Sequence, residues 1–130
     1  MIRVLVCDGL DAVPPGLQQA FSAGDDLHFA GQAHNSPEAL ALVRQGGIDL
    51  VLMDIAMPQR DGPDVMRQLR SEFPRLPVLM FGTCPDKQFA VRSLKLGAAG
   101  YLSQGADAGQ AIRQVAAGGL YLTAGGHPLQ

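Results

Sequence analysis

The stretch IDLVLMD, residues 48–54, decides the fold, because it is a nearly continuous apolar run that ends in an aspartate. Such a run is typical of a strand that is covered on both faces, as in a parallel sheet. Residues 2–7 and 77–81 repeat the pattern, and residues 100–102 form a shorter run. Residues 27–33 are more polar, which favours a strand at the edge of the sheet. We therefore predict five strands, three of them fully buried.

The segments between these runs have helical spacing. Residues 13–21, 65–73 and 108–116 carry apolar side chains three and four positions apart. Ser36 and Pro37 predict an N-cap and a first helical residue, and Gly46-Gly47 predicts the end of that helix. Alternating strands and helices predict an α/β fold, (βα)5, with a doubly wound five-stranded parallel sheet in the order 2-1-3-4-5. This flavodoxin-like order keeps the polar second strand at an edge.

Length and charge exclude several classes of protein. The 130 residues predict one domain, and a formal net charge of −2 gives no electrostatic footprint for nucleic acid. No apolar run reaches the roughly 18 residues of a membrane span. Two cysteines do not make a disulfide framework, so we expect a cytoplasmic domain. It should cover residues 1–123, and residues 124–130, which lack periodicity, should be a linker toward a further domain.

Two carboxylates end neighbouring strands of this predicted sheet. Asp8 follows the first strand and Asp54 ends the third. Ligands of such folds bind beyond the carboxyl ends of the strands, at the point where the strand order reverses. Paired carboxylates there suit Mg²⁺, and an aspartate can also accept a phosphoryl group. The alternative is that each aspartate caps the helix that follows it.

Three motifs in the expected order resemble the receiver domains of bacterial response regulators. VLMDIAMPQRDG, residues 51–62, is similar to the segment that carries their phosphoacceptor aspartate. GAAGYL, residues 97–102, resembles their fifth strand, and AIRQVAAGGLYL, residues 111–122, resembles the last helix of the NarL/LuxR-type subfamily. The resemblance implies regulation within a two-component phosphorelay, not metabolic catalysis. A helix-turn-helix DNA-binding output domain normally follows in that subfamily.

The resemblance also implies roles for individual residues. Asp54 matches the phosphoacceptor, and Ala56 would offer its backbone carbonyl to Mg²⁺. Asp8 matches a carboxylate that reaches the metal through water. Tyr101 matches an aromatic switch that turns inward on activation. The alternative for Tyr101 is an aromatic that half covers the end of its strand.

Three positions depart from the family pattern. Gly9 replaces a second aspartate that binds the metal directly, and Gly82 replaces the Ser or Thr that hydrogen-bonds the phosphoryl group. Gln104 replaces the Lys that pairs with the phosphate. Thr83 is the candidate substitute for that hydroxyl, but it comes one residue late, and in an extended strand a shift of one residue turns a side chain to the opposite face. We therefore expect Mg²⁺ binding to be weak or absent.

Two functions remain open on the sequence. In the first, a sensor histidine kinase phosphorylates Asp54, and the domain controls its own output domain. In the second, a pseudo-receiver acts as a dimerisation or partner-binding module without phosphate. Both predict contact with DNA only through a domain outside this chain, and neither involves a membrane. A third function, cofactor binding as in flavodoxin, is disfavoured, since the loop after the first strand lacks a Ser/Thr-rich phosphate cradle.

Overall fold

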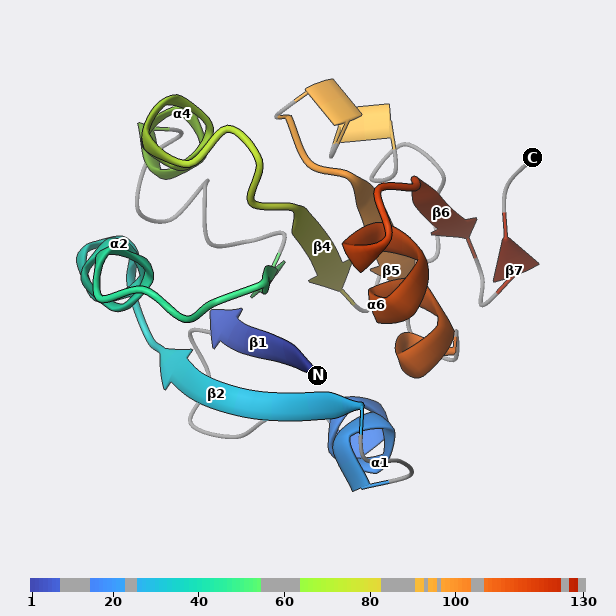
Figure 1. Cartoon of the computed structure of the whole chain (residues 1–130). Coiled ribbons are helices and arrows are strands. Elements are labelled where there is room, and N and C mark those ends of the chain that lie inside the picture. Colours follow the sequence, from blue (N-terminus) through green and yellow to red (C-terminus); the bar gives the residue numbers. More distant parts are fainter. Residues whose placement is uncertain are drawn as a thin grey trace.

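The computed structural model describes residues 1–7, 15–22, 26–54, 64–82, 91–92, 94–95, 97–103, 107–124 and 127–128. The strands are β1 (Ile2–Cys7), β2 (Leu27–Ala33), β3 (Leu50–Asp54), β4 (Val78–Gly82), β5 (Gly100–Ser103), β6 (Tyr121–Ala124) and β7 (His127–Pro128). The labelled helices are α1 (Pro15–Ser22), α2 (Ser36–Arg44), α4 (Asp64–Glu72) and α6 (Ala108–Ala116) (Figure 1).

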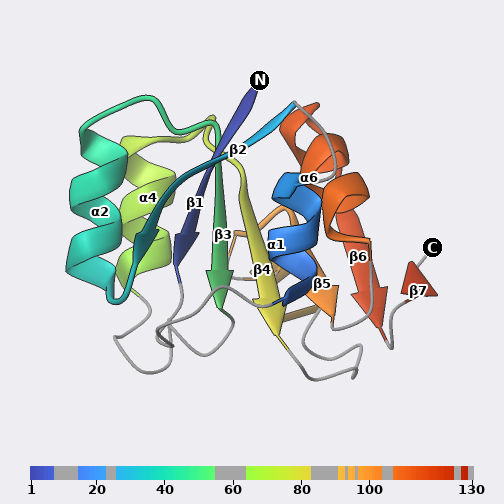
Figure 2. The ribbon, with the colours of Figure 1, turned by 90° about the horizontal axis from the view of Figure 1, so that it is seen from below.

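The first five strands form a parallel sheet in the order β2-β1-β3-β4-β5, which confirms the predicted fold. All four residues that precede Asp54 in β3 are completely buried, as the apolar run predicted. Helices α2 and α4 cover one face of the sheet, and α1 and α6 cover the other (Figure 2). Side chains that alternate along each strand therefore feed two separate cores.

Two short strands extend this sheet beyond the predicted five. β6 pairs in parallel with β5, and β7 pairs with β6 in the antiparallel direction. The sequence did not indicate either strand, because each is too short to show a period. Part of the segment 124–130, expected as a linker, thus continues the sheet. That the segment 124–130 leads to another domain stays a prediction.

The helix after β2 begins differently from the prediction. Asn35, not Ser36, is the N-cap of α2, and its side chain accepts a hydrogen bond from the Glu38 amide at 2.9 Å. Ser36 is instead the first helical residue and is buried. The asparagine side chain satisfies an amide that the helix itself leaves without a partner. The predicted stop is confirmed, because Gly46 has a φ of 88°.

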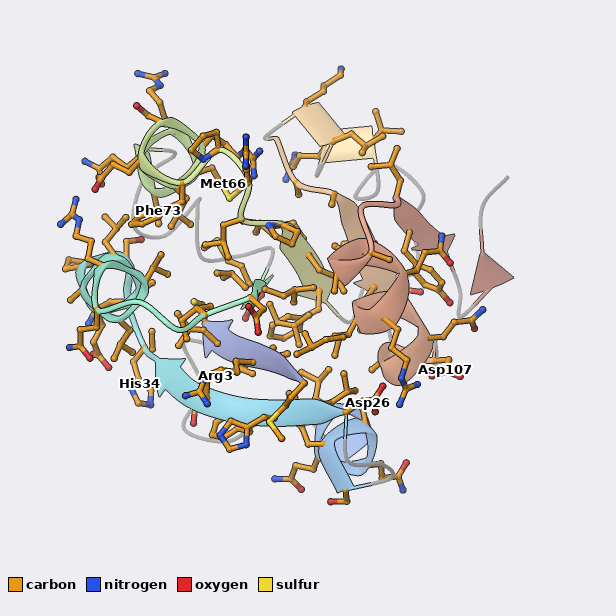
Figure 3. The ribbon with its side chains drawn as sticks, viewed as in Figure 1. Arg3, Asp26, His34, Met66, Phe73 and Asp107 are labelled. Carbon is orange, nitrogen blue, oxygen red and sulfur yellow. The ribbon has the colours of Figure 1, made fainter. Side chains whose placement is uncertain are left out.

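Bidentate ion pairs tie helices to their neighbours on each face. Arg44 of α2 binds Glu72 of α4 at 2.9 and 2.6 Å. Arg113 of α6 binds Asp26, the residue before β2, at 2.6 and 3.1 Å (Figure 3). All four side chains are well exposed, so each pair fixes geometry more than it adds stability.

Candidate functional site

Asp54 lies where the fold favours a ligand. It is the last residue of β3, which runs between β1 and β4, and it pairs with Phe81 of β4. Its side chain is partly exposed, whereas the preceding Met53 is completely buried. The sheet thus presents one carboxylate to the surface at the carboxyl end of its central strand.

The register of β1 supports the expected position of Asp8. Cys7, the residue before Asp8, pairs with Met53, the residue before Asp54. Asp8 itself lies outside the described residues, as do Gly9, Ala56, Thr83 and Gln104. The convergence of the two carboxylates therefore stays a prediction, and the register of β1 against β3 supports it.

Cys7 belongs to the core and not to the site chemistry. The side chain is completely buried, among residues of the α2 and α4 face. Burial raises the pKa of its thiol to about 12, and the Glu38 carboxylate adds to the shift. A thiol that stays protonated is a poor nucleophile and a poor metal ligand.

Gly82 leaves the expected hydroxyl position without a side chain. It ends β4 and pairs with Ser103, which ends β5. Ser103 is one of only two buried polar residues in the described part of the chain, and the sequence analysis did not single it out. The sequence did contain an indication that Ser103 points inward, because it follows Tyr101 by two positions and the two side chains therefore lie on the same face of the sheet.

Tyr101 is turned into the core. It pairs with Met80 of β4, and its side chain is completely buried on the face covered by α2 and α4. Met66 on α4 belongs to the same cluster and lies between that helix and the sheet (Figure 3). The alternative of a half-covered aromatic at the strand end is therefore wrong. The ring belongs to a core cluster drawn from several elements, and a strand pattern alone cannot show that.

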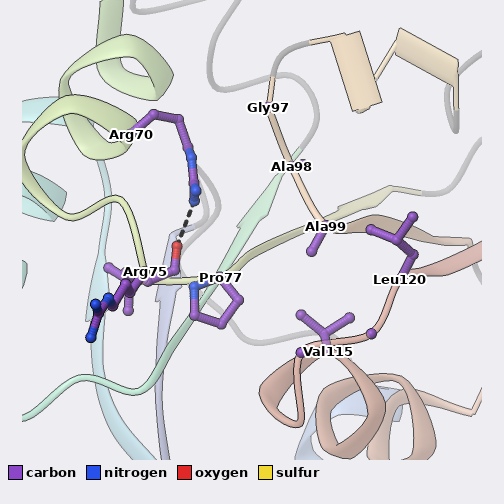
Figure 4. Close-up of a pocket in the computed structure, with 11 residues that line it drawn as sticks. Arg70, Arg75, Pro77, Gly97, Ala98, Ala99, Val115 and Leu120 are labelled. Atoms are coloured by element: carbon purple, nitrogen blue, oxygen red, sulfur yellow. Dashed lines mark hydrogen bonds between the residues drawn. The ribbon is translucent and has the colours of Figure 1, made fainter.

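The hollows found among the described residues lie at the other end of the sheet. One, of about 260 Å³, is lined by Pro77 and Ala99, the residues just before β4 and β5 (Figure 4). The guanidinium of Arg70 at its rim donates to the carbonyls of Leu76 at 2.7 Å and Pro74 at 2.6 Å. Since these bonds close the turn from α4 to β4, this arginine has a structural role.

The described part of the chain holds neither a ready-made metal cluster nor a membrane-spanning helix. It contains no group of three His, Cys, Asp or Glu side chains arranged to hold a metal. Asp54 is the only described side chain of the predicted magnesium set. None of the described helices is both long and apolar enough to cross a bilayer.

The sequence is similar to longer bacterial regulators. Response regulator GacA of Pseudomonas viridiflava is 39% identical over 126 residues, which are 95% of this chain and 59% of GacA. Transcriptional regulatory protein LnrK of Bacillus subtilis (strain 168) is 32% identical over 125 residues, which are 94% of this chain and 57% of LnrK. The chain therefore spans less than two thirds of these relatives.

Solved structures share the fold. A two-component response regulator of the LuxR family from Aurantimonas sp. SI85-9A1 superposes with a TM-score of 0.80 at 25% identity, covering 95% of this chain and 89% of that one. The isolated REC domain of RcsB from Salmonella enterica serovar Typhimurium gives a TM-score of 0.77 at 16% identity, covering 93% of this chain and 92% of that one. Residues 4–116 match the response regulator receiver domain, and the chain belongs to that family.

Proposed function

We propose that this chain is the receiver module of a two-component transcription regulator, and that Asp54 is the phosphoacceptor of an incomplete site. The observation that carries the proposal is a partly exposed carboxylate at the carboxyl end of a central, otherwise buried strand. A carboxylate in that position is accessible to a phosphorylated histidine of a sensor kinase. The carboxylate oxygen would attack phosphorus, and the imidazole would leave, giving an aspartyl phosphate.

The output lies outside this chain. LnrK is named a transcriptional regulatory protein, and the aligned part covers 57% of it. This supports a DNA-binding output domain beyond the receiver, with DNA contact confined to that domain. A homodimer of receivers would place two such output domains side by side.

The donor set fits Mg²⁺, but incompletely. Asp54 and Asp8 would supply carboxylate oxygens and Ala56 a carbonyl oxygen, which are the ligand types that magnesium prefers. When bound, the metal would offset charge on the phosphoryl oxygens. Gly9 has no side-chain oxygen to complete the set. The loss of an outer-shell partner alone costs roughly 10–100-fold in metal affinity, and a direct ligand should cost at least as much.

The charge of the site explains why the fold tolerates these departures. A complete family site has three carboxylates and one lysine, formally −2. This site has Asp8 and Asp54 without a lysine, also −2. The acidic residue at Gly9 and the lysine at Gln104 are missing together, so repulsion in the folded state is roughly unchanged. The loss falls on metal and phosphoryl binding.

One observation favours the second function, a pseudo-receiver that acts without phosphate. Tyr101 is completely buried, and Gly82 offers no hydroxyl through which a phosphoryl group could draw it inward. In this reading the domain holds one conformation permanently and serves as a dimerisation or partner-binding module.

The first test is phosphorylation followed by intact mass. The chain is incubated with acetyl phosphate and Mg²⁺, beside a Gly9→Asp, Gly82→Thr, Gln104→Lys variant and an Asp54→Asn control. We expect slow, partial modification of the wild type, faster modification of the triple variant and none of the control. A wild type that is modified as fast and as fully as the triple variant would contradict the incomplete site.

The second test separates the two functions. Asp54→Asn is introduced into the full-length regulator, and a reporter of its output is measured at matched protein levels. Loss of regulation supports the phosphorelay. Unchanged regulation supports the pseudo-receiver, since that function does not use the carboxylate.

A further inference from the structure

Strand β6 sits on β5 through a backbone contact that a glycine makes possible. Gly100 pairs with Tyr121, and the Tyr121 amide donates to the Ala99 carbonyl at 3.1 Å. A Cβ built on Gly100 would lie 2.8 Å from the carbonyl carbon of Tyr121, and closer still to its oxygen. Real Cβ atoms do not approach backbone so closely, so any other residue at 100 would displace β6.

The side chain of Tyr121 anchors the strand from the other side. It is 5% exposed and packs in the core cluster that includes Ile112 and Val115 of α6. Its pKa is raised, chiefly by burial and also by the Asp107 carboxylate. β6 is thus held by apolar packing as well as by its backbone.

The turn after α6 has a defined geometry that directs the chain into β6. Gly118 has a φ of 99°, and the Gly119 amide donates to the Gln114 carbonyl at 3.0 Å. The side-chain amide of Gln114 then donates to the Leu120 carbonyl at 2.5 Å. Helix α6 therefore fixes the direction in which the chain leaves it, one residue before β6 begins.

The same strand encloses Tyr101. Tyr101 pairs with Met80 of β4 on one side and with Leu122 of β6 on the other, and its side chain belongs to the core cluster on the α2 and α4 face of the sheet. Without β6, the outer edge of β5 would be unpaired, and the side chain of Tyr101 would have room to rotate toward that edge. The docked strand removes that side.

We propose that docking of β6 on β5 and burial of Tyr101 form one coupled equilibrium, through which the domain sets the path of the chain that follows α6. Gly100 and Gln114 are its positioning residues. The proposal rests on the proposed receiver function in one respect, because only that function makes Tyr101 a switch residue. The coupling itself belongs to the unmodified chain and requires no phosphoryl group.

The chain offers a direct probe of Tyr101. It contains two tyrosines and no tryptophan, so Tyr121→Phe leaves Tyr101 as the sole strong intrinsic fluorophore. In that background, Gly100→Ala is compared with the parent by acrylamide quenching, and hydrogen exchange of residues 118–124 is followed by mass spectrometry. We expect exchange to rise roughly tenfold or more, because the displaced strand loses its hydrogen bond and packing. Quenching of Tyr101 should rise with it.

A milder pair of variants guards against a general loss of folding. Gln114→Ala removes the side-chain bond to Leu120 and leaves β5 untouched, and Gln110→Ala, also exposed on α6, is the matched control. Exchange and quenching should rise together in Gln114→Ala and stay at the parent level in Gln110→Ala. Exchange that rises without a change in quenching would overturn the coupling. An unchanged exchange rate in Gly100→Ala would overturn the steric argument. Both outcomes are independent of whether Asp54 accepts a phosphoryl group.

Discussion

Replacing Tyr101 by alanine tests whether this residue is part of the core or a mobile surface switch. The side chain is completely buried in the core cluster on the α2 and α4 face, and its strand lies between β4 and β6. An aromatic residue buries about 150–250 Å², which at about 25 cal/mol per Å² corresponds to about 4–6 kcal/mol. Alanine retains part of this, and the unfolded chain is already partly compact, so we expect a loss of about 3–5 kcal/mol in the free energy of unfolding.

Urea denaturation followed by circular dichroism measures this loss, with the slope of the transition checked for two-state behaviour. Tyr101→Phe keeps the ring and should cost only about 1 kcal/mol, the contribution of a hydroxyl hydrogen bond. Leu94→Ala, at a side chain that is 38% exposed, is the surface control and should cost less than about 1 kcal/mol. If Tyr101→Ala costs no more than Leu94→Ala, the ring spends most of its time outside the core, and the reasoning fails.

Three further outcomes follow from the site and the ion pairs. Calorimetry should show Mg²⁺ binding only at millimolar concentrations, and Gly9→Asp should tighten it roughly tenfold or more; a tight wild-type site would contradict the incomplete donor set. When Cys84, the only other cysteine of the sequence, is replaced by serine, Cys7 should react with a thiol reagent only on unfolding, because its pKa is about 12 and it is buried; rapid labelling of the folded chain would refute this. Arg113 holds the pKa of Asp26 below its usual range by a hydrogen bond, so the carboxylate stabilises the fold above its unfolded pKa, and this contribution disappears as the pH falls through the lower, folded value. Urea unfolding of wild type and Asp26→Asn should therefore differ at neutral pH and converge in acid, and a gap that persists in acid would assign the effect to packing.

The sheet was predictable because its central strands are buried on both faces. The runs at 50–53 and 77–81 have no polar side, and a parallel sheet under two layers of helices accommodates such strands. Asp54 was predictable for the same reason, since a charge directly after a buried run must lie at the sheet edge. Both inferences depend on neighbours in the sequence and need no contact between distant residues.

Two features that the sequence did not reveal, β6 and the burial of Tyr101, depend on distant contacts, whereas the cap of α2 depends on a local one. β6 exists because the backbone of Tyr121 meets a glycine 21 positions earlier, and neither residue signals this in its own neighbourhood. The burial of Tyr101 depends on its strand neighbours β4 and β6 and on a core cluster drawn from several elements. The cap of α2 at Asn35 was misplaced by one position because serine and asparagine both favour N-caps, and only the hydrogen bond to the Glu38 amide decides between them.

β7 is the last strand in the sheet order, and its composition limits the pairing of further strands with that edge. An exposed strand edge offers unpaired amides and carbonyls to another chain, and natural sheets blunt such edges with short strands and prolines. β7 has two residues and ends in Pro128, which has no amide hydrogen to donate. The edge of β5 that β6 covers has no such protection, since it consists of Gly100, Tyr101, Leu102 and Ser103. Any state in which β6 leaves β5 therefore also uncovers a template for strand addition between molecules, so the protein's resistance to aggregation depends on the same strand that encloses Tyr101.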